Sequence, residues 1–548
     1  MRSLTPDDVL REHQLLHGEA LTFGNKFLFI FPHHFISVFI LILTLLIPWS
    51  RQGPLSYVRY LSFSCIVYFT TRAVTRIQSL GLASGYGAGV IVAWFLVWSA
   101  TLLVFNNPQQ EFSRIEKSTP GGCVPVASRV PSKGGGSALS SVPPRRRDRA
   151  TGFHDRPHDA KDEETSQSTN VITDEPEPPY FRWQPFPESF PHRFYWVLDL
   201  VFNFRGPGWN WRISTLQPLP FVVHLQLNGA SGTGMSQKAF DLEAAKKTLR
   251  SLLRTVAWSY LTLDVIKPVL TKDPYFLGII PSQSPYLSAL DPESPLTRLI
   301  NFLFHQGASL CVIIIAIRFV AAAFWATLLG VVVLCSRFAG TRFAIPLEQP
   351  WMYPEFFGPC WSSILDRGLA GTWASWWHQL FRFSYVSAGK WTISHLPASF
   401  QRKPNLTRSL RVFIAFLLSG FLHSIGSYTQ VSHTHPFSGS FLFFLLQAPG
   451  ILLQTTVAKY LNEQLPFQVP RWLRRAGNLI FVALWFCLTG PLEGDDLARC
   501  GIWLLEPVPF SLVNALGYGD GKGPWRWTWK WIQVWRGEQW WDRGILIL

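Results

Sequence analysis

Apolar stretches about as long as a bilayer is thick recur along the chain, and they restrict its fold more than any other feature. A helix needs about 20 apolar residues to cross the hydrocarbon core of a membrane. Candidate spans lie at 27–49, 57–69, 87–105, 303–335, 409–428, 437–453, 473–488 and 502–516. The sequence therefore predicts an all-α, polytopic membrane bundle of about eight to ten spans. Residues 303–335 are too long for one straight span, so either one tilted helix or two shorter pieces fit them.

Composition argues for an integral membrane protein and against an ordinary soluble enzyme. Of the 548 residues, 48% are hydrophobic and 15% are charged. A net charge of +15 would suggest nucleic acid in a soluble protein. Here much of the Lys and Arg lies beside apolar runs, where lipid headgroups and topology explain it, so we expect no nucleic-acid partner. The seven cysteines are scattered without a CxxC pair, so neither a metal site nor a disulfide framework is expected.

Changes in composition predict three regions. Residues 1–105 contain a polar lead and the N-terminal transmembrane helices. Residues 106–190 are rich in Pro, Gly, Ser and mixed charge, and we expect much of this linker to be disordered. Residues 191–548 return to apolar and aromatic sequence and are predicted to form the membrane domain that carries the chemistry. The Gly-rich piece 228–236 is predicted to be a loop, because no Gly-Lys-Ser/Thr follows it.

A histidine lies in the second half of the apolar stretch 409–428. An ionisable side chain at such a place must be held by polar neighbours or line a cavity, so His423 is a candidate functional residue. At helical spacing, Phe416, Ser419 and Gly420 share its face and predict a lined pocket. The alternative is a core histidine bonded to a neighbouring helix.

A second chemical stretch occupies residues 351–382. Its first half contains Pro354, Gly358 and Pro359 and is predicted to be a turn or a re-entrant segment packed inside protein. Its second half has a helical pattern with two stripes. The apolar stripe is Trp373, Trp377 and Phe381, and the polar stripe is Ser375, His378 and Arg382. The alternative is an interfacial aromatic belt with a snorkelling arginine.

The motif Arg-Gly-Pro-Gly-Trp-Asn-Trp at 205–211 predicts a compact turn. Two glycines around Pro207 demand a tight bend, and Trp209 and Trp211 prefer the membrane interface. We therefore expect an interfacial hairpin here. The Trp-rich and basic tail at 523–543 is also expected to lie on the headgroups.

The segment Trp-Trp-His-Gln at 376–379, followed by Phe-Leu-Leu-Ser-Gly-Phe-Leu-His at 416–423, resembles the membrane-bound O-acyltransferase superfamily. The likeness is to its wax synthase-like branch. The turns at 205–211 and 351–358 are similar to fungal members of that branch, many of which acetylate secondary metabolites. The resemblance extends from about residue 193 to the C-terminus.

This resemblance implies a reaction and roles for named residues. His423 matches the catalytic histidine, which would act as the base toward an attacking hydroxyl. His378 matches the polar residue of the Trp-rich segment and, with Gln379 or Ser419, is a candidate to stabilise the tetrahedral intermediate or to orient a substrate. Arg382 and Arg411, with Arg408, are candidates for the phosphates of coenzyme A. The lead 372–375 departs from the basic, glycine-containing lead of close members.

The implied protein is a multi-pass enzyme of the endoplasmic reticulum without a bound cofactor or metal. It would transfer an acetyl group from acetyl-CoA to a hydroxyl of a hydrophobic terpenoid, meroterpenoid or polyketide. One alternative is a wax or sterol ester synthase that uses long-chain acyl-CoA. Another is a transporter or a non-catalytic scaffold, although paired half-repeats with broken helices are not seen in the sequence. His433 and His435 lack the further ligands that a metal would need, and a polar loop is expected there.

Overall fold

The computed structural model describes most of the chain outside one long internal segment. The described residues are 5–23, 26–28, 30–49, 53–78, 82–118, 180–229, 242–338, 344–377, 379–430, 433–519, 521, 523–527, 532–536 and 543–547. The greater part of the predicted linker, the Gly-rich piece from residue 230 onward, residues 528–531 and 537–542 of the Trp-rich tail and His378 lie outside them.

Helices dominate the described part of the chain. The α-helices are α1 (Pro6–Thr22), α2 (Ile36–Leu46), α3 (Val58–Arg76), α4 (Leu82–Ala100), α5 (Pro108–Glu111), α6 (Phe190–Phe202), α7 (Phe221–Leu227), α8 (Leu242–Leu270), α9 (Pro295–Phe338), α10 (Cys360–Gly371), α11 (Arg382–Ser394), α12 (Ala398–Gln401), α13 (Pro404–Tyr428), α14 (Leu442–Gln464), α15 (Arg471–Arg499) and α16 (Leu512–Ala515). The π-helical turns η3 (Thr101–Phe105), η7 (Thr372–Trp376) and η8 (Phe437–Phe441) adjoin α4, α10 and α14.

Five helices within the described residues are long and apolar enough to cross a membrane. They are 85–105, 295–336, 404–428, 437–464 and 471–499. The prediction of an all-α, polytopic membrane protein is confirmed. Residues 303–335 belong to the single helix α9, which settles the choice between one helix and two pieces.

Two predicted spans are wrong in their extent. Within 27–49, the short strands Phe27–Leu28 and Ile30–Phe31 precede the 11-residue helix α2. Within 502–516, only a 3-10 turn at Ile502–Leu504 and the four-residue helix α16 form. Both ranges contain prolines or polar residues that interrupt a helix. The length of the apolar stretch alone could not show that the first range begins with short strands and that the second is mainly turns.

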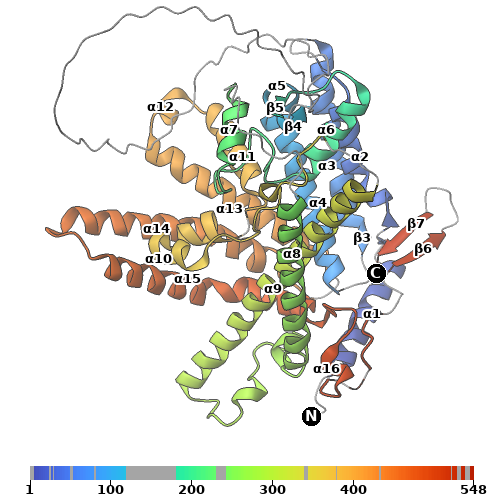
Figure 1. The fold of residues 1–548 in the computed structure, drawn as a ribbon. Helices are drawn as coiled ribbons and strands as arrows, with labels where there is room; N and C mark the ends of the chain where they lie inside the picture. The colour runs from blue at the N-terminus through green and yellow to red at the C-terminus, as the bar shows by residue number, and fades with distance from the viewer. Residues whose placement is uncertain are drawn as a thin grey trace, which may run out of the picture.

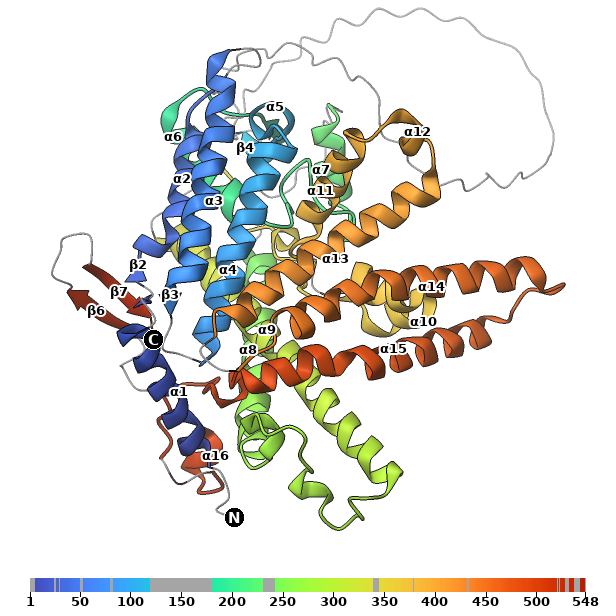
Figure 2. The ribbon, with the colours of Figure 1, turned by 180° about the vertical axis from the view of Figure 1, so that it is seen from behind.

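The helices form two groups that meet at α13. Figure 2 shows α2, α3 and α4 standing side by side, with α13, α14 and α15 stacked across from them. In Figure 1, α8 runs down the middle of the molecule, and α9 crosses it obliquely from the lower left. The largest hydrophobic cluster joins α2, α3 and α4 to α6 and α13, and a second cluster joins α10, α13, α14 and α15. Because α13 contributes to both, it is the structural centre of the molecule.

The turn at 205–211 is buried, contrary to the prediction of an interfacial hairpin. Trp209 is 1% exposed and Trp211 is 9% exposed, and both belong to the largest hydrophobic cluster. Gly206 has a φ of +62°, and a Cβ there would come within 2.8 Å of the Trp211 ring. This close approach lets the turn fold its own indole rings into the core, where they meet Trp196 and Phe383.

Small sheets complete the fold. Strands β4 (Arg114–Ser118) and β5 (Tyr180–Gln184) pair antiparallel with Arg114 opposite Gln184. Strands β6 (Ile532–Arg536) and β7 (Arg543–Ile547) form an antiparallel pair whose second strand also joins Ile30–Phe31. The C-terminal strands therefore pack against a segment near the N-terminus.

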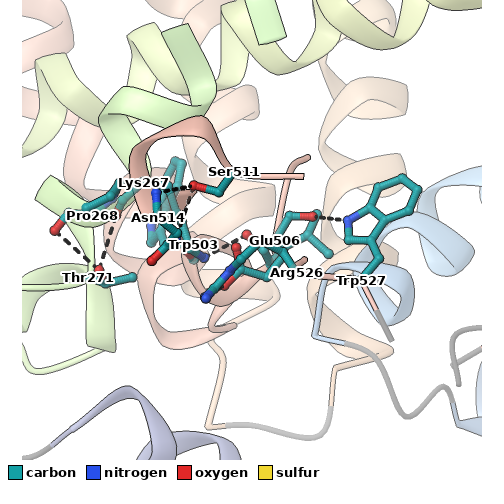
Figure 3. A network of polar contacts seen from close by, with 10 residues as sticks. Lys267, Pro268, Thr271, Trp503, Glu506, Ser511, Asn514, Arg526 and Trp527 are labelled. Atoms are coloured by element: carbon teal, nitrogen blue, oxygen red, sulfur yellow. Dashed lines mark hydrogen bonds and ion pairs between the residues drawn. The ribbon is translucent and has the colours of Figure 1, made fainter. Parts of the chain in front are cut away.

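A polar network ties the segment after α15 to α8 (Figure 3). Lys267 on α8 donates to the carbonyls of Trp503 at 2.8 Å and Leu505 at 2.7 Å. Arg526 pairs with Glu506 at 2.6 Å, and the Trp527 indole donates to the Glu506 carbonyl at 2.9 Å. A small polar pocket lies between these residues. Arg526 and Glu506 form an ion pair, and Lys267 and Asp264 bind backbone groups of the C-terminal segment, so the network docks that segment on α8.

Candidate active site

Helices α4 and α13 cross at very close range, and this crossing places His423. A Cβ on Gly89 of α4 would come within 2.7 Å of the Ile425 carbonyl. A Cβ on Gly426 of α13 would come within 2.6 Å of Val90. Small residues at such a crossing let two helices approach until side chains beside the crossing touch. The Thr429 hydroxyl also donates to the Gly85 carbonyl at 2.9 Å and ties the ends together.

His423 belongs to a polar triad with Tyr86 and Glu493. The hydroxyl of Tyr86 on α4 lies 2.9 Å from His423 Nδ1. The same hydroxyl donates to Glu493 Oε1 on α15 at 3.2 Å. His423 Nδ1 and Glu493 Oε1 are 3.9 Å apart, and their side chains are only 18% and 14% exposed. Three helices thus each supply one polar side chain to one partly enclosed site.

An aromatic wall fixes the plane of the His423 ring. Phe444 stacks on the imidazole with centroids 4.1 Å apart and an interplanar angle of 19°. Trp373 lies 5.8 Å from Phe444, and its indole donates to Gln447 at 3.2 Å. Stacking restricts the ring's orientation, while the Tyr86 contact restricts its tilt. The Trp-rich segment is therefore joined to the histidine through Phe444 of α14, and Gln447 of the same helix holds Trp373.

A buried carboxylate on α15 joins the end of α13 to the turn η8 next to this site. Asp496 is 1% exposed and accepts hydrogen bonds from Ser427 at 2.6 Å and Ser440 at 3.2 Å. It also accepts the backbone amide of His435 at 2.5 Å. These contacts connect the end of α13, the turn η8 and α15, so the loop with His433 and His435 is fixed by hydrogen bonds. Among the described residues no group of His, Cys, Asp or Glu has the arrangement of a metal site.

The two turn motifs pack on one another and then on the Trp-rich segment. Arg205 donates to the carbonyls of Glu355 at 2.8 Å and Pro354 at 3.5 Å. Burial lowers the pKa of the Arg205 guanidinium to about 10. Gly358 donates its amide to the Trp376 carbonyl at 2.9 Å, and a Cβ there would come within 1.9 Å of the Ser375 carbonyl. The predicted turn at 351–358 thus packs inside protein.

The second half of 351–382 is not the continuous helix that its pattern predicted. The π-helical turn η7 ends at Trp376, Trp377 has extended backbone with ψ of 149°, and α11 begins at Arg382. Gln379 replaces the lost helical bonds, because its amide donates to the carbonyls of Trp377 at 2.6 Å and Trp373 at 3.2 Å. The helical pattern of residues 373–382 could not show this break, because the Gln379 side chain and not the local periodicity stabilises it.

Of the predicted site residues, Ser419 lies next to His423 on the same helix. The recorded contacts of Gln379, Arg382 and Arg411 are with other parts of the protein. Ser419 is buried on α13, one turn before His423. Gln379 uses its amide nitrogen on two backbone carbonyls. Arg382 lies beyond the break, where its Nη1 donates to the Ala374 carbonyl at 2.8 Å. Arg411 is exposed on α13 and its stem faces Gly389 of α11, where a Cβ would come within 3.2 Å of it. The position of His378 lies outside the described residues.

Tyr86 and Glu493 were missed in the sequence. The signal for Glu493 was present, because Glu493, Asp495 and Asp496 directly follow an apolar run, where carboxylates are costly without a role. Tyr86 carried no comparable signal, since a tyrosine near a helix end is ordinary at a membrane interface. Its role depends on a helix crossing that joins residues 337 positions apart.

Comparison with known proteins agrees with this architecture. A model of the membrane bound O-acyl transferase family matches residues 353–446, the stretch from the second turn to η8 and the start of α14. Acetyltransferase spyB of Aspergillus fumigatus is 25% identical over 321 residues, or 54% of this chain and 46% of that protein. Acetyltransferase atnC of Arthrinium sp is 24% identical over 338 residues, or 59% of this chain and 67% of that protein.

A third relative carries another name. O-Mevalon transferase macI of Penicillium terrestre is 24% identical over 278 residues, or 48% of this chain and 53% of that protein. The chain thus matches about half of the length of two of these three relatives. No solved structure matches the chain.

Fold and site together define an all-α, polytopic membrane protein with a histidine centre between three helices. The predicted resemblance is confirmed: the segment 353–446 matches the membrane bound O-acyl transferase family, and the chain is similar to fungal proteins named acetyltransferases. The names of these relatives agree with the acyltransferase that the sequence predicts.

Proposed function

We propose that this protein transfers an acetyl group from acetyl-CoA to a hydroxyl of a hydrophobic secondary metabolite, with His423 as the general base. The observation that carries the proposal is the triad of Tyr86, Glu493 and His423 inside a membrane bundle. A half-buried histidine with one occupied nitrogen is arranged for proton transfer at the other. Similarity to proteins named acetyltransferases supports acetyl as the acyl group that the donor carries.

The hydrogen bonds select one tautomer of His423. A tyrosine hydroxyl has a single hydrogen to donate. Tyr86 places that hydrogen on Glu493 Oε1, so its oxygen accepts the Nδ1–H of His423. The lone pair of a neutral imidazole is then on Nε2. In our proposal Nε2 is the atom that takes the proton of the acceptor alcohol.

The proposed reaction balances without a further reagent. Nε2 of His423 accepts the hydroxyl proton as the alcohol oxygen attacks the thioester carbon. The carbonyl oxygen becomes an oxyanion, which needs preorganised donors in a water-poor site. As the intermediate collapses, the carbon–sulfur bond breaks and the thiolate takes the proton from the imidazolium. The products are the acetate ester and coenzyme A, and His423 returns to its neutral form.

The oxyanion donor is part of the proposal. Ser419 lies one turn from His423 on α13 and offers a hydroxyl. The amide of Gln379 donates to two carbonyls, so in our proposal it braces the Trp-rich segment. His378 stays a proposed substrate-orienting residue. We also propose the endoplasmic reticulum as the membrane of residence, to be checked by fractionation against a resident marker.

The test is a donor and acceptor matrix with the full chain in nanodiscs. Acetyl-CoA and palmitoyl-CoA are each offered with a panel of terpenoid alcohols, polyketide alcohols and ergosterol, and ester products are measured by mass spectrometry. We expect acetyl esters from the wild type and a loss of at least about a hundredfold in His423→Ala, because general-base catalysis contributes about 10² to 10⁴. His433→Ala is the matched control, an exposed histidine in the following loop.

Three other outcomes would contradict the proposal, each in a different way. Esters formed only from palmitoyl-CoA would replace it with a wax or sterol ester synthase. Undiminished turnover in His423→Ala would remove the histidine from the mechanism. Absence of transfer with every donor, together with solute uptake by reconstituted vesicles, would identify a transporter.

A further inference from the structure

Three acidic residues follow the apolar part of α15, and the fold satisfies two of them. Asp496 accepts three hydrogen bonds, two from serine hydroxyls and one from a backbone amide. Asp495 Oδ1 accepts the hydroxyl of Tyr275 at 3.0 Å and the amide of Gln306 at 3.4 Å. Glu493 is the third, and its Oε1 accepts the hydroxyl of the triad tyrosine at 3.2 Å. The carboxylate nearest the proposed base is therefore the one with the fewest hydrogen-bond donors.

The second carboxylate oxygen of Glu493 is enclosed by protein and unpaired. Oε2 is buried, and it makes no hydrogen bond with the described part of the chain. The hydroxyl of Ser440 lies near it, but the single hydrogen of that hydroxyl goes to Asp496 Oδ2 at 3.2 Å. No Lys or Arg of the described residues forms an ion pair with Glu493, whose ionic contact is with His423. One hydrogen bond thus holds this carboxylate.

An enclosed carboxylate with one donor needs another donor from outside the fold. Burial removes the water that would solvate the oxygen, and an unmet polar group or charge inside protein is costly. His423 does not neutralise it, because the proposed tautomer is uncharged and directs its Nδ1–H to the Tyr86 oxygen. A molecule bound at the site is then the source of the missing hydrogen bond.

The unpaired oxygen lies beside the proposed base, across the imidazole from its reactive nitrogen. Glu493 Oε1 is 3.9 Å from Nδ1 of His423, whereas Nε2 is the atom proposed to take the alcohol proton. Phe444 covers one face of the ring, so an acceptor reaches Nε2 along the other face or the ring edge. An acceptor that extends past the imidazole brings its far end to Oε2. Its two points of contact are separated by at least the width of the ring.

We propose that Glu493 Oε2 accepts a hydrogen bond from a second hydroxyl of the acceptor. The acceptor class is then a cyclic diol, in which one hydroxyl is acetylated and the other, across a ring, donates to the carboxylate. This inference rests on the proposed function, because it names the acceptor of that same site. An ionised carboxylate accepts hydrogen bonds and donates none, so a carbonyl in the place of the second hydroxyl is rejected. Glu493 thus selects the acceptor as well as positioning Tyr86.

The experiment compares three matched acceptors with the full chain in nanodiscs and acetyl-CoA as donor. They are a cyclic terpenoid diol with its hydroxyls across the ring from each other, the mono-alcohol without the second hydroxyl, and the hydroxyketone with a carbonyl in its place. We expect kcat/KM for the diol to exceed both others about ten- to a hundredfold, the effect of one hydrogen bond to a charged group.

Glu493→Gln tests the contact directly, because it keeps an oxygen for Tyr86 and replaces Oε2 by an N–H donor. Tyr86 has a hydrogen to donate, which keeps the amide oxygen on its side and turns the amide nitrogen to the acceptor. We expect the ratio of kcat/KM for diol over hydroxyketone to fall at least about tenfold, whatever the overall rate. Glu463→Gln, at an exposed position of α14, is the matched control and should keep the wild-type ratio.

Tyr86→Phe separates acceptor preference from rate. It slows the reaction with every acceptor but leaves Oε2 in place, so its ratio should equal that of the wild type. A ratio that changes as much in Tyr86→Phe as in Glu493→Gln would overturn the proposal, because the triad would then set the preference. Equal kcat/KM for the diol and the mono-alcohol in the wild type would overturn it as well. So would a wild-type preference for the hydroxyketone, which requires a protonated carboxyl.

Binding without donor distinguishes this inference from the proposed function. Thermal unfolding of the solubilised protein is measured alone, to show that each variant is folded, and with each acceptor. The diol should raise the melting temperature of the wild type most, and the hydroxyketone that of Glu493→Gln. Diol-selective stabilisation without ester formation from any donor would refute the proposed function and leave the acceptor site supported. Ester formation with no preference among the three acceptors would refute the acceptor site alone.

Discussion

The substitution Tyr86→Phe isolates the part of the site that links His423 to Glu493. It removes one oxygen atom and keeps the ring. That oxygen makes both contacts of the triad, at 2.9 Å to His423 Nδ1 and 3.2 Å to Glu493 Oε1. Phenylalanine therefore leaves Nδ1 without its acceptor and the carboxylate without its donor. Because the ring remains, packing at the α4–α13 crossing should change little.

The size of the effect follows from the lost hydrogen bonds. A hydrogen bond to a charged partner contributes about 1.5–3 kcal/mol, and each 1.36 kcal/mol is a tenfold change in rate. We therefore expect kcat to fall about ten- to a hundredfold. This is smaller than the loss in His423→Ala, because the imidazole that accepts the proton is still present. The KM for acetyl-CoA should stay the same, since Tyr86 is proposed to orient the base and not to bind the donor.

The assay is ester formation from acetyl-CoA with an acceptor identified in the matrix described above. Tyr460→Phe is the matched control, because Tyr460 is exposed on α14. Glu493→Gln is a second test. Because glutamine retains an oxygen that accepts the Tyr86 hydrogen, this variant should lose less activity than Glu493→Ala. Wild-type kcat in folded Tyr86→Phe would refute the argument, as would a loss confined to KM.

Three further predictions concern stability. Gly426→Ala should lower the melting temperature of the solubilised protein, because the added Cβ would meet Val90 at 2.6 Å and overpacking costs about 1–3 kcal/mol. The control is Gly477→Ala, where the added Cβ meets nothing within 4 Å, and it should be neutral or slightly stabilising. Equal effects of the two substitutions would contradict the close crossing of α4 and α13. Arg205→Met should destabilise the folded protein by about 1–3 kcal/mol, because the carbonyls of Pro354 and Glu355 lose their hydrogen-bond donor. The measurement is thermal unfolding, with Arg254→Met, at an exposed position of α8, as the control. An unchanged melting temperature would mean that the two turns pack together without the Arg205 hydrogen bonds. Asp366 on α10 binds Arg475 of α15 at 2.7 Å, and Asp366→Asn should lower the melting temperature at neutral pH. The difference in melting temperature between variant and wild type should shrink as the pH falls below 3.8, because a carboxyl with a depressed pKa stabilises the fold only while it is ionised. If the difference persists at such acid pH, the charge of Asp366 is not its cause.

The sequence by itself determined the membrane class, the position of the main spans and the place of His423 on one of them. These features depend on local composition and on helical periodicity, which a single stretch of chain carries. The compact turns at 205–211 and 351–358 were also predictable, because Gly and Pro restrict the backbone where they stand. Their burial was not, since an indole ring has the same local sequence at an interface and in a core.

Only the tertiary structure decided what surrounds His423 and which charges remain unpaired. Tyr86 and Glu493 lie 407 residues apart and meet through one hydroxyl group, and no local pattern encodes such a contact. Likewise Asp366 and Arg367 are neighbours in sequence, yet α15 captures the carboxylate and leaves the arginine to the turn at Ser375. Helix packing chooses among partners that are chemically equivalent along the chain, and that choice defines the site.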